Sequence, residues 1–167
     1  MKPMVFIPAD PTDVGALRDG SSLRPGAAYA ATPTLRTTFD YGPDADEDAD
    51  FAAQLFASLR CLIDGRVRLL LAAEIAQLPA ETGEKEFGEV ARPEITWRDV
   101  RAVFTDDPVS LPAVRAYADT THGRTLADLW ADDATHKFLE HHHLLWFDPT
   151  ELDQALAGLG APPANGD

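Results

Sequence analysis

Basic residues are scarce in this sequence of 167 residues. Lysine and arginine number 14 against 28 aspartates and glutamates, which gives a formal net charge of −14 at pH 7. Proteins that bind nucleic acids or anionic membranes use basic patches to attract phosphate groups. We therefore expect no nucleic-acid partner and no membrane partner, while a basic protein partner or a bound cation is compatible with this charge.

Cysteine and long apolar runs are also nearly absent. The single Cys61 cannot form an internal disulfide, and its apolar helical surroundings predict a packing residue and not a nucleophile. No stretch approaches the roughly 18 apolar residues of a membrane-spanning helix. The first residues, MKPMVFIPADP, do not have the pattern of a signal peptide. These observations predict a cytoplasmic protein.

Established catalytic motifs are missing from the sequence as well. There is no G-x-G-x-x-G, no P-loop, no C-x-x-C pair and no G-x-S-x-G. Ser58 and His122 could be combined into a triad on paper, but such a choice is open in almost any chain, so we assign them no role. We expect no cofactor.

Apolar runs alternate with capped amphipathic segments along the chain. This alternation predicts an α+β or α/β fold with a mixed sheet of about four to six strands and about five helices. We expect one globular domain over residues 1–160 and a disordered tail over 161–167. The predicted strands are 5–9, 27–32, 66–75, 96–107 and 144–147. The predicted helices are 11–17, 51–63, 108–119, 125–140 and 152–159.

Periodicity predicts how these elements are buried. The run 66–75 is apolar on both faces, which indicates a strand covered on both sides. The run 96–107 alternates and indicates a half-exposed strand, whereas the polar run 77–94 predicts a loop or an irregular hairpin. Phe51 and Leu55 begin the apolar stripe of the helix 51–63.

Aromatic residues should supply much of the core. We expect Phe6, Phe104, Trp146 and Phe147 to be buried, so that Trp146→Ala would cost about 3–5 kcal/mol. Trp97 is predicted to be partly buried, with an exposed anchor for a partner as the alternative.

Six acids lie between Asp40 and Asp50. Acids in the first turn of a helix offset the positive end of its dipole, so we interpret this run as a solvated helix start. A metal loop or a docking tail is the alternative, although the run lacks the glycine and terminal glutamate of a calcium loop.

An Asp-Pro pair follows an apolar run at three places: FIPADPTDVGAL, VFTDDPVSLPAV and LLWFDPTELDQAL. The aspartates Asp10, Asp107 and Asp148 can each cap a helix that begins with proline. Alternatively, parallel strands could bring the three carboxylates to one sheet edge, where they could hold Mg²⁺ or Mn²⁺ for hydrolysis.

Histidines gather near residue 140. His136, Glu140, His141, His142 and His143 contain zinc-binding groups, but their spacing matches no established zinc motif. Histidines at the end of a helix are also favoured by its dipole, so we predict a solvated helix end.

Four segments, FIPA, AYAATP, ASLRCL and LLWFDPTEL, carry a resemblance that spans most of the chain. Together they resemble an uncharacterised family of small proteins from high-GC Gram-positive bacteria. The resemblance implies a single cytoplasmic domain with a mixed α/β sandwich and assigns no functional residue.

Two functions follow from the sequence. The leading hypothesis is a non-catalytic interaction or regulatory domain with a protein partner, indicated by the missing catalytic motifs and the acidic composition. The alternative is a metal-dependent hydrolase that uses Asp10, Asp107 and Asp148. The oligomeric state is left open.

Overall fold

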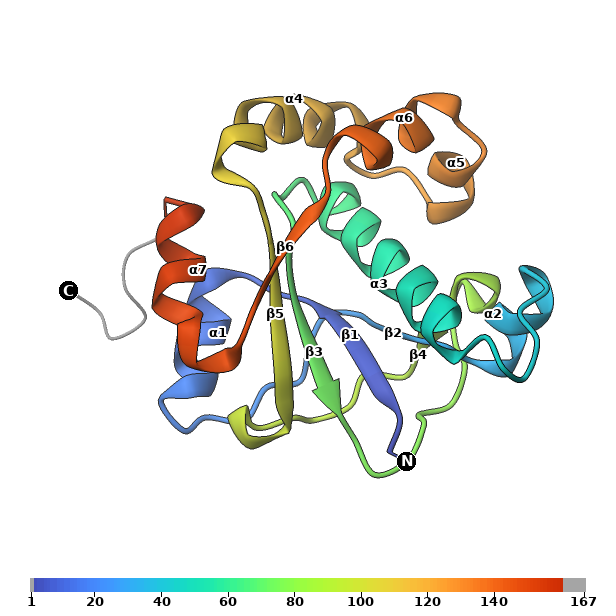
Figure 1. Ribbon diagram of the computed structural model, residues 1–167, viewed down its shortest axis with the longest axis horizontal. Coiled ribbons are helices and arrows are strands. Elements are labelled where there is room, and N and C mark those ends of the chain that lie inside the picture. The colour runs from blue at the N-terminus through green and yellow to red at the C-terminus, as the bar shows by residue number, and fades with distance from the viewer. Residues whose placement is uncertain (1, 161–167) are drawn as a thin grey trace.

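Six strands form one sheet at the centre of the computed structural model, which describes residues 2–160 (Figure 1). Their order is β4-β2-β1-β3-β5-β6, and every pairing is antiparallel. The strands are β1 Met4–Pro8, β2 Ala28–Ala30, β3 Leu69–Glu74, β4 Glu89–Val90, β5 Val100–Asp106 and β6 Leu144–Phe147. The prediction of an α+β fold with four to six strands is confirmed, whereas the sheet is antiparallel throughout and not mixed as expected.

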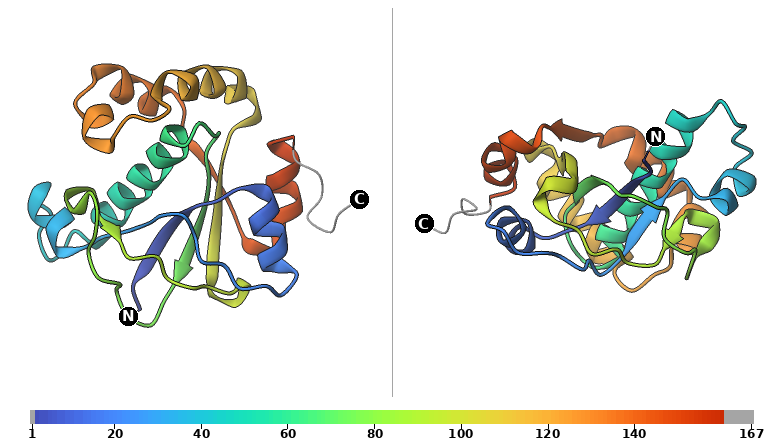
Figure 2. Two further views of the ribbon diagram at one scale, coloured as in Figure 1. Left: turned by 180° about the vertical axis from the view of Figure 1, so that it is seen from behind. Right: turned by 90° about the horizontal axis from the view of Figure 1, so that it is seen from below.

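Helices pack on both faces of this sheet (Figures 1 and 2). The α-helices are α1 Pro11–Arg18, α2 Pro33–Thr38, α3 Asp46–Ile63, α4 Leu111–Thr121, α5 Leu126–Trp130, α6 Asp133–His141 and α7 Leu152–Gly158. Short 3-10 helices are η1 Lys85–Phe87, η2 Trp97–Asp99, η3 Pro108–Ser110 and η4 Pro149–Glu151. Helices α1 and α7 cover one face, and α3 lies across the other, with α4 near its C-terminal end and α5 and α6 alongside it.

Alternation along β3 creates the two cores. Leu69 and Leu71 pack with α1 and α7, whereas Leu70 and Ala72 pack under α3. Successive side chains of a strand point to opposite faces, so a strand between two helical layers is apolar on both. The predicted double coverage of this strand is confirmed.

The neighbouring strand β5 differs from its prediction. Its pairing with β3 shifts between Ala72 and Ala73, and this irregularity breaks the alternation of β5. Val100 and Val103 therefore join the α1 and α7 core while Ala102 joins the α3 core. The predicted half-exposed strand is wrong, because β5 lies between β3 and β6 with helices on both sides.

The predicted helix over 125–140 is two helices. Asp132 adopts an extended backbone and accepts a hydrogen bond from the Ala134 N–H at 2.9 Å, which ends α5 and starts α6. Ala134, in the first turn of α6, is exposed. The short helix α2 was not predicted, although Thr32 followed by Pro33 forms its cap.

Two large apolar residues predicted for the core lie at the surface. Phe6 is buried as expected, and Phe104 and Phe147 are partly buried against the two cores. Trp146 is 59% exposed and Phe51 is 55% exposed. Trp146 lies on the last strand of the sheet, beyond which residues 2–160 supply no further strand. Helix α3 turns alanines and Phe56 towards the sheet in place of Phe51.

The remaining elements follow their predictions closely. The last helix lies where it was predicted, and Leu152, Leu156 and Leu159 are buried there. The acids Asp46, Glu47 and Asp48 occupy the first turn of α3, which confirms the predicted helix start. The predicted tail over 161–167 lies outside the described residues.

Candidate functional site

Each of the three Asp-Pro pairs caps a helix. Asp10 accepts from the Asp13 N–H at 2.9 Å, and Asp107 accepts from the Val109 N–H at 3.0 Å. Asp148 accepts from the Thr150 N–H at 3.0 Å and from the Thr150 hydroxyl at 2.8 Å. The bond from the Thr150 backbone N–H, followed by the bond from its hydroxyl, lowers the pKa of Asp148 below its usual value. The helix-starting interpretation of the repeated motif is confirmed.

Sheet topology does not bring the three carboxylates together. β1 and β5 both run antiparallel to β3, so Asp10 and Asp107 follow their strands at the same end of the sheet. β6 runs antiparallel to β5 and places Asp148 at the opposite end. Because β6 runs opposite to β1 and β5, the three carboxylates do not meet at one edge of the sheet. Within residues 2–160, no group of three or more His, Cys, Asp or Glu side chains could hold a metal ion.

The histidines at the end of α6 contact separate partners. His136 Nε2 donates to the Trp130 carbonyl at 2.8 Å, and His143 Nε2 donates to the Glu140 carbonyl at 2.9 Å. His142 Nδ1 lies 3.1 Å from the Ser110 hydroxyl. Each of these three histidines therefore has a hydrogen-bond partner of its own, and within residues 2–160 they form no metal-binding group.

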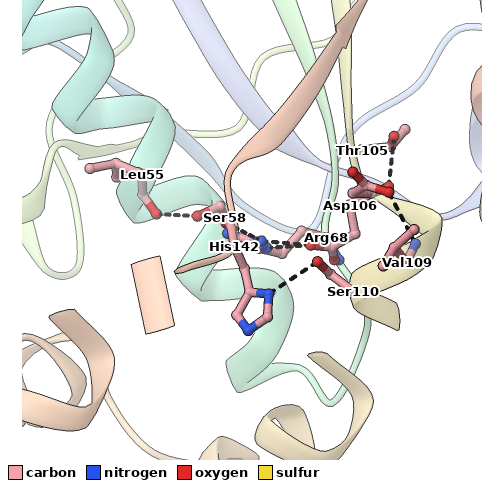
Figure 3. A network of polar contacts seen from close by, with 9 residues as sticks. Leu55, Ser58, Arg68, Thr105, Asp106, Val109, Ser110 and His142 are labelled. Carbon is pink, nitrogen blue, oxygen red and sulfur yellow. Dashed lines mark hydrogen bonds and ion pairs between the residues drawn. The ribbon is translucent and has the colours of Figure 1, made fainter. Parts of the chain in front are cut away.

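The most unusual polar group is a buried ion pair that the sequence analysis missed. Arg68 precedes β3 and Asp106 ends β5, and their side chains are 1% and 0% exposed. Arg68 donates to one carboxylate oxygen from Nε at 2.8 Å and from Nη2 at 2.6 Å, while its backbone N–H donates to the other at 2.7 Å (Figure 3). Since unpaired buried charges are costly, the full set of bonds explains how the pair is tolerated.

The same arginine ties the sheet to the α6 region. Its Nη2 also donates to the His142 carbonyl at 2.7 Å, and its guanidinium lies 4.9 Å from the centre of the Phe138 ring. Phe138 in turn stacks on Tyr117 of α4 at 4.4 Å between ring centres. Arg68 is thus fixed in position by contacts from β5, α6 and the segment before β6.

A cavity of about 390 Å³ opens beside this arginine, and we call it the α3–α6 cavity. Its walls come from α3, α5, α6 and the start of β6, and Arg68 lines it from the sheet side. The apolar residues that line it are Phe51, Leu55, Trp130, Leu139 and Leu144. The polar residues are Gln54, Arg68, His136, Glu140, His142 and His143. Cavities of this size hold small ligands in many proteins.

Next to the cavity, β6 forms an open edge of the sheet. Its sequence is LLWF, none of its four side chains is buried, and none is charged. Leu144 lines the cavity, and Trp146, two residues further on, lies on the same face of the sheet. The opposite edge, β4, has only two residues and is further bridged between Val90 and Glu81. Native proteins usually keep edge strands short or place charged side chains on them. β6 is longer than β4 and carries no charged side chain.

Other candidates from the sequence have structural roles. Cys61 is fully buried, and burial raises the pKa of its thiol to about 11, in agreement with a packing residue. Ser58 is buried and donates to the Leu55 carbonyl at 2.7 Å. Trp97 is half-buried and packs against the α1 and α7 core, which confirms the partly buried prediction.

The residues of the cavity could have been found only in part from the sequence. The aspartate at the end of an apolar strand, Asp106, is a signal that a buried partner exists, but its partner is 38 residues away in the chain. Phe51 and Trp146 were recognised as large apolar residues and assigned to the wrong environment.

No helix that the structure describes is long and apolar enough to cross a membrane.

Comparisons with known proteins agree with the predicted resemblance at the level of the family. Neither the curated proteins nor the solved structures contain a match to this chain. The model of a family of unknown function, DUF6912, matches residues 4–156. This match runs from the first strand into the last helix and includes every residue of the cavity. The chain therefore belongs to the DUF6912 family of unknown function.

Proposed function

We propose that this protein is a non-catalytic interaction domain that binds a partner protein along the β6 edge. The observation that carries the proposal is the exposed strand LLWF, which pairs on one side only among the strands that the structure describes. An exposed apolar edge promotes aggregation unless another chain pairs with it. Strand addition is a common way for an extended segment to bind such an edge.

Charge supports a particular kind of partner. The chain carries −14, so a second strongly acidic surface would be repelled, whereas a segment with basic residues would be attracted. Apolar side chains of that segment would pack against Trp146, as exposed aromatic residues often serve as anchors at interfaces. The partner segment is therefore extended, apolar on one face and basic on the other.

Capture experiments with matched variants test the proposal. Trp146→Lys places a charge on the edge, and Leu78→Lys places the same charge on another exposed apolar residue, in the loop after β3. We expect a protein that is captured by the wild type and by Leu78→Lys but lost with Trp146→Lys. Equal capture by both variants would contradict the proposal. Sedimentation velocity of the purified chain then separates a foreign partner from a second copy, which would appear as a dimer.

Two further inferences, on cellular location and on taxonomic origin, accompany this proposal. We infer a cytoplasmic location, supported by the single buried Cys61, which is free of any disulfide. We also keep the proposal of an origin in high-GC Gram-positive bacteria, supported by the four segments of the resemblance. Fractionation of the source cells tests the location.

A further inference from the structure

We propose that the α3–α6 cavity binds a small carboxylate with an apolar body, for which Arg68 supplies the anion contact. This site goes beyond the proposed protein interaction, because it concerns the interior of the cavity and not the edge of the sheet. The cavity combines apolar walls with one polar side, which is the usual composition of a site for a small organic ligand.

The first argument is the state of Arg68. Its hydrogen bonds to Asp106 and His142 use Nε and Nη2 and leave the two hydrogens of Nη1 outside these contacts. The side chain is only 1% exposed, yet it lines the cavity. Of the buried side-chain nitrogens and oxygens in the described part of the chain, none lacks a hydrogen-bond partner. Nη1, which makes none of these bonds, is therefore not fully buried, and we place it on the cavity wall that Arg68 lines.

The second argument is rigidity. A guanidinium that is held by a carboxylate and a carbonyl and stacked 4.9 Å from Phe138 loses little freedom when it binds a ligand. Such preorganised donors bind acceptors more tightly than mobile surface side chains do. A carboxylate oxygen that accepts from Nη1 forms a charge-assisted hydrogen bond.

The third argument is local charge. Acids outnumber bases two to one in this chain, with 28 against 14. Among the described residues that line the cavity this ratio is one to one, Arg68 against Glu140, and three histidines accompany them. His136 and His143 use Nε2 for carbonyl contacts and keep Nδ1 for other partners. An anion is therefore better accommodated here than the net charge of the protein suggests.

The fourth argument is the shape of the apolar wall. Trp130 is held edge-on against Phe56 at 5.1 Å between ring centres and also contacts His136 at 4.4 Å. Leu55 and Leu139 face the same space from α3 and α6. A ring or short branched chain attached to the carboxylate would lie between these side chains, since apolar contact supplies most of the binding energy of such ligands.

Titration with a matched pair of probes tests the site. The probes are 3-phenylpropanoate and its neutral analogue 3-phenylpropan-1-ol, which share the ring and differ in charge. In ¹⁵N-resolved NMR of the intact chain we expect the carboxylate to bind at least about tenfold more tightly, with shifts at Arg68 Nε and at the amides around His142. Equal binding of both probes, or no binding of the carboxylate, would overturn the proposal.

Variants that leave the Arg68–Asp106 ion pair intact complete the test. Leu55→Trp fills the cavity and should reduce binding of 3-phenylpropanoate by about tenfold or more, whereas Leu78→Trp, at an exposed residue outside the cavity lining, should not change it. Unchanged binding in Leu55→Trp would place the ligand elsewhere and overturn the site. Trp146→Lys should leave this affinity intact, because Trp146 does not line the cavity. Failure of the ligand site and failure of the protein interaction are therefore distinguishable.

Discussion

At the scale of single residues, the Arg68–Asp106 pair is the feature with the largest expected energetic effect. Asp106→Ala leaves the buried guanidinium without its carboxylate, so we predict a loss of about 3–5 kcal/mol in the free energy of unfolding. Urea denaturation followed by tryptophan fluorescence measures this loss. The control is Glu74→Ala, which removes the half-buried partner of the exposed Arg101 at 3.7 Å and should cost less than about 1 kcal/mol.

A double substitution separates the cost of a broken pair from the value of the intact one. Arg68→Met combined with Asp106→Leu removes both charges and fills most of the space, so it should destabilise less than Asp106→Ala alone. If the double variant proved the less stable of the two, the pair would contribute net stability, and its burial would need no functional explanation.

Exposure of Trp146 reverses an expectation from the sequence. With 59% of its surface exposed, Trp146→Ala should cost less than about 1 kcal/mol and not the 3–5 kcal/mol of a core aromatic. Phe56, which is 1% exposed, is the matched comparison and should cost about 3–5 kcal/mol when changed to alanine. Comparable losses in the two variants, measured by urea denaturation, would argue against the exposed position of Trp146.

The buried thiol of Cys61 predicts a dependence on alkaline pH. Burial raises the pKa of this thiol from 9.0 to about 11, so between these values the unfolded chain loses the proton while the folded chain keeps it. The contribution of Cys61 to stability is complete below pH 9 and declines as pH rises towards 11. Unfolding of the wild type and of Cys61→Ala across this range should show a shallower decline in the variant. Parallel curves would contradict the raised pKa.

At the scale of elements, the break between α5 and α6 positions one wall of the cavity. Trp130 ends α5, His136 lies in the first half of α6, and their rings are 4.4 Å apart because Asp132 separates the two helices. Asp132→Ala removes the cap of α6 and should cost about 0.5–2 kcal/mol. Thermal unfolding checks this value against Asp44→Ala, a change in the exposed loop before α3 that should have little effect. A negligible loss in Asp132→Ala would mean that the cap does not fix the break.

The two sheet edges differ in how they are protected. β4 is short and bridged to Glu81, whereas β6 presents four apolar residues beside an apolar cavity. The apolar run LLWF is typical of a covered strand. It correctly predicted a strand at β6 and wrongly predicted that Trp146 is buried there. Strand order decides whether such a run is central or at an edge, and strand order depends on contacts far apart in the sequence.

At the scale of the whole molecule, local signals predicted most of the elements but few of the relations between them. Asp10, Asp107 and Asp148 were correctly interpreted as caps because capping involves residues two or three positions apart. The hypothesis that they share an ion required a strand direction that no local signal contains. Phe51 and Trp146 were assigned to the core for the same reason, and both lie on the face where we propose binding. Places where local rules fail are often functional.

Site-specific photo-crosslinking tests the central claim most directly. A photoreactive phenylalanine analogue replaces Trp146 on the β6 edge, or Leu78 in the loop after β3 as a control, in cells that produce the protein. The account predicts one discrete adduct at position 146, joined to a partner segment with basic and apolar residues, and none at position 78. Absence of an adduct at 146, or the same adducts at both positions, would contradict the claim that the β6 edge is a binding surface.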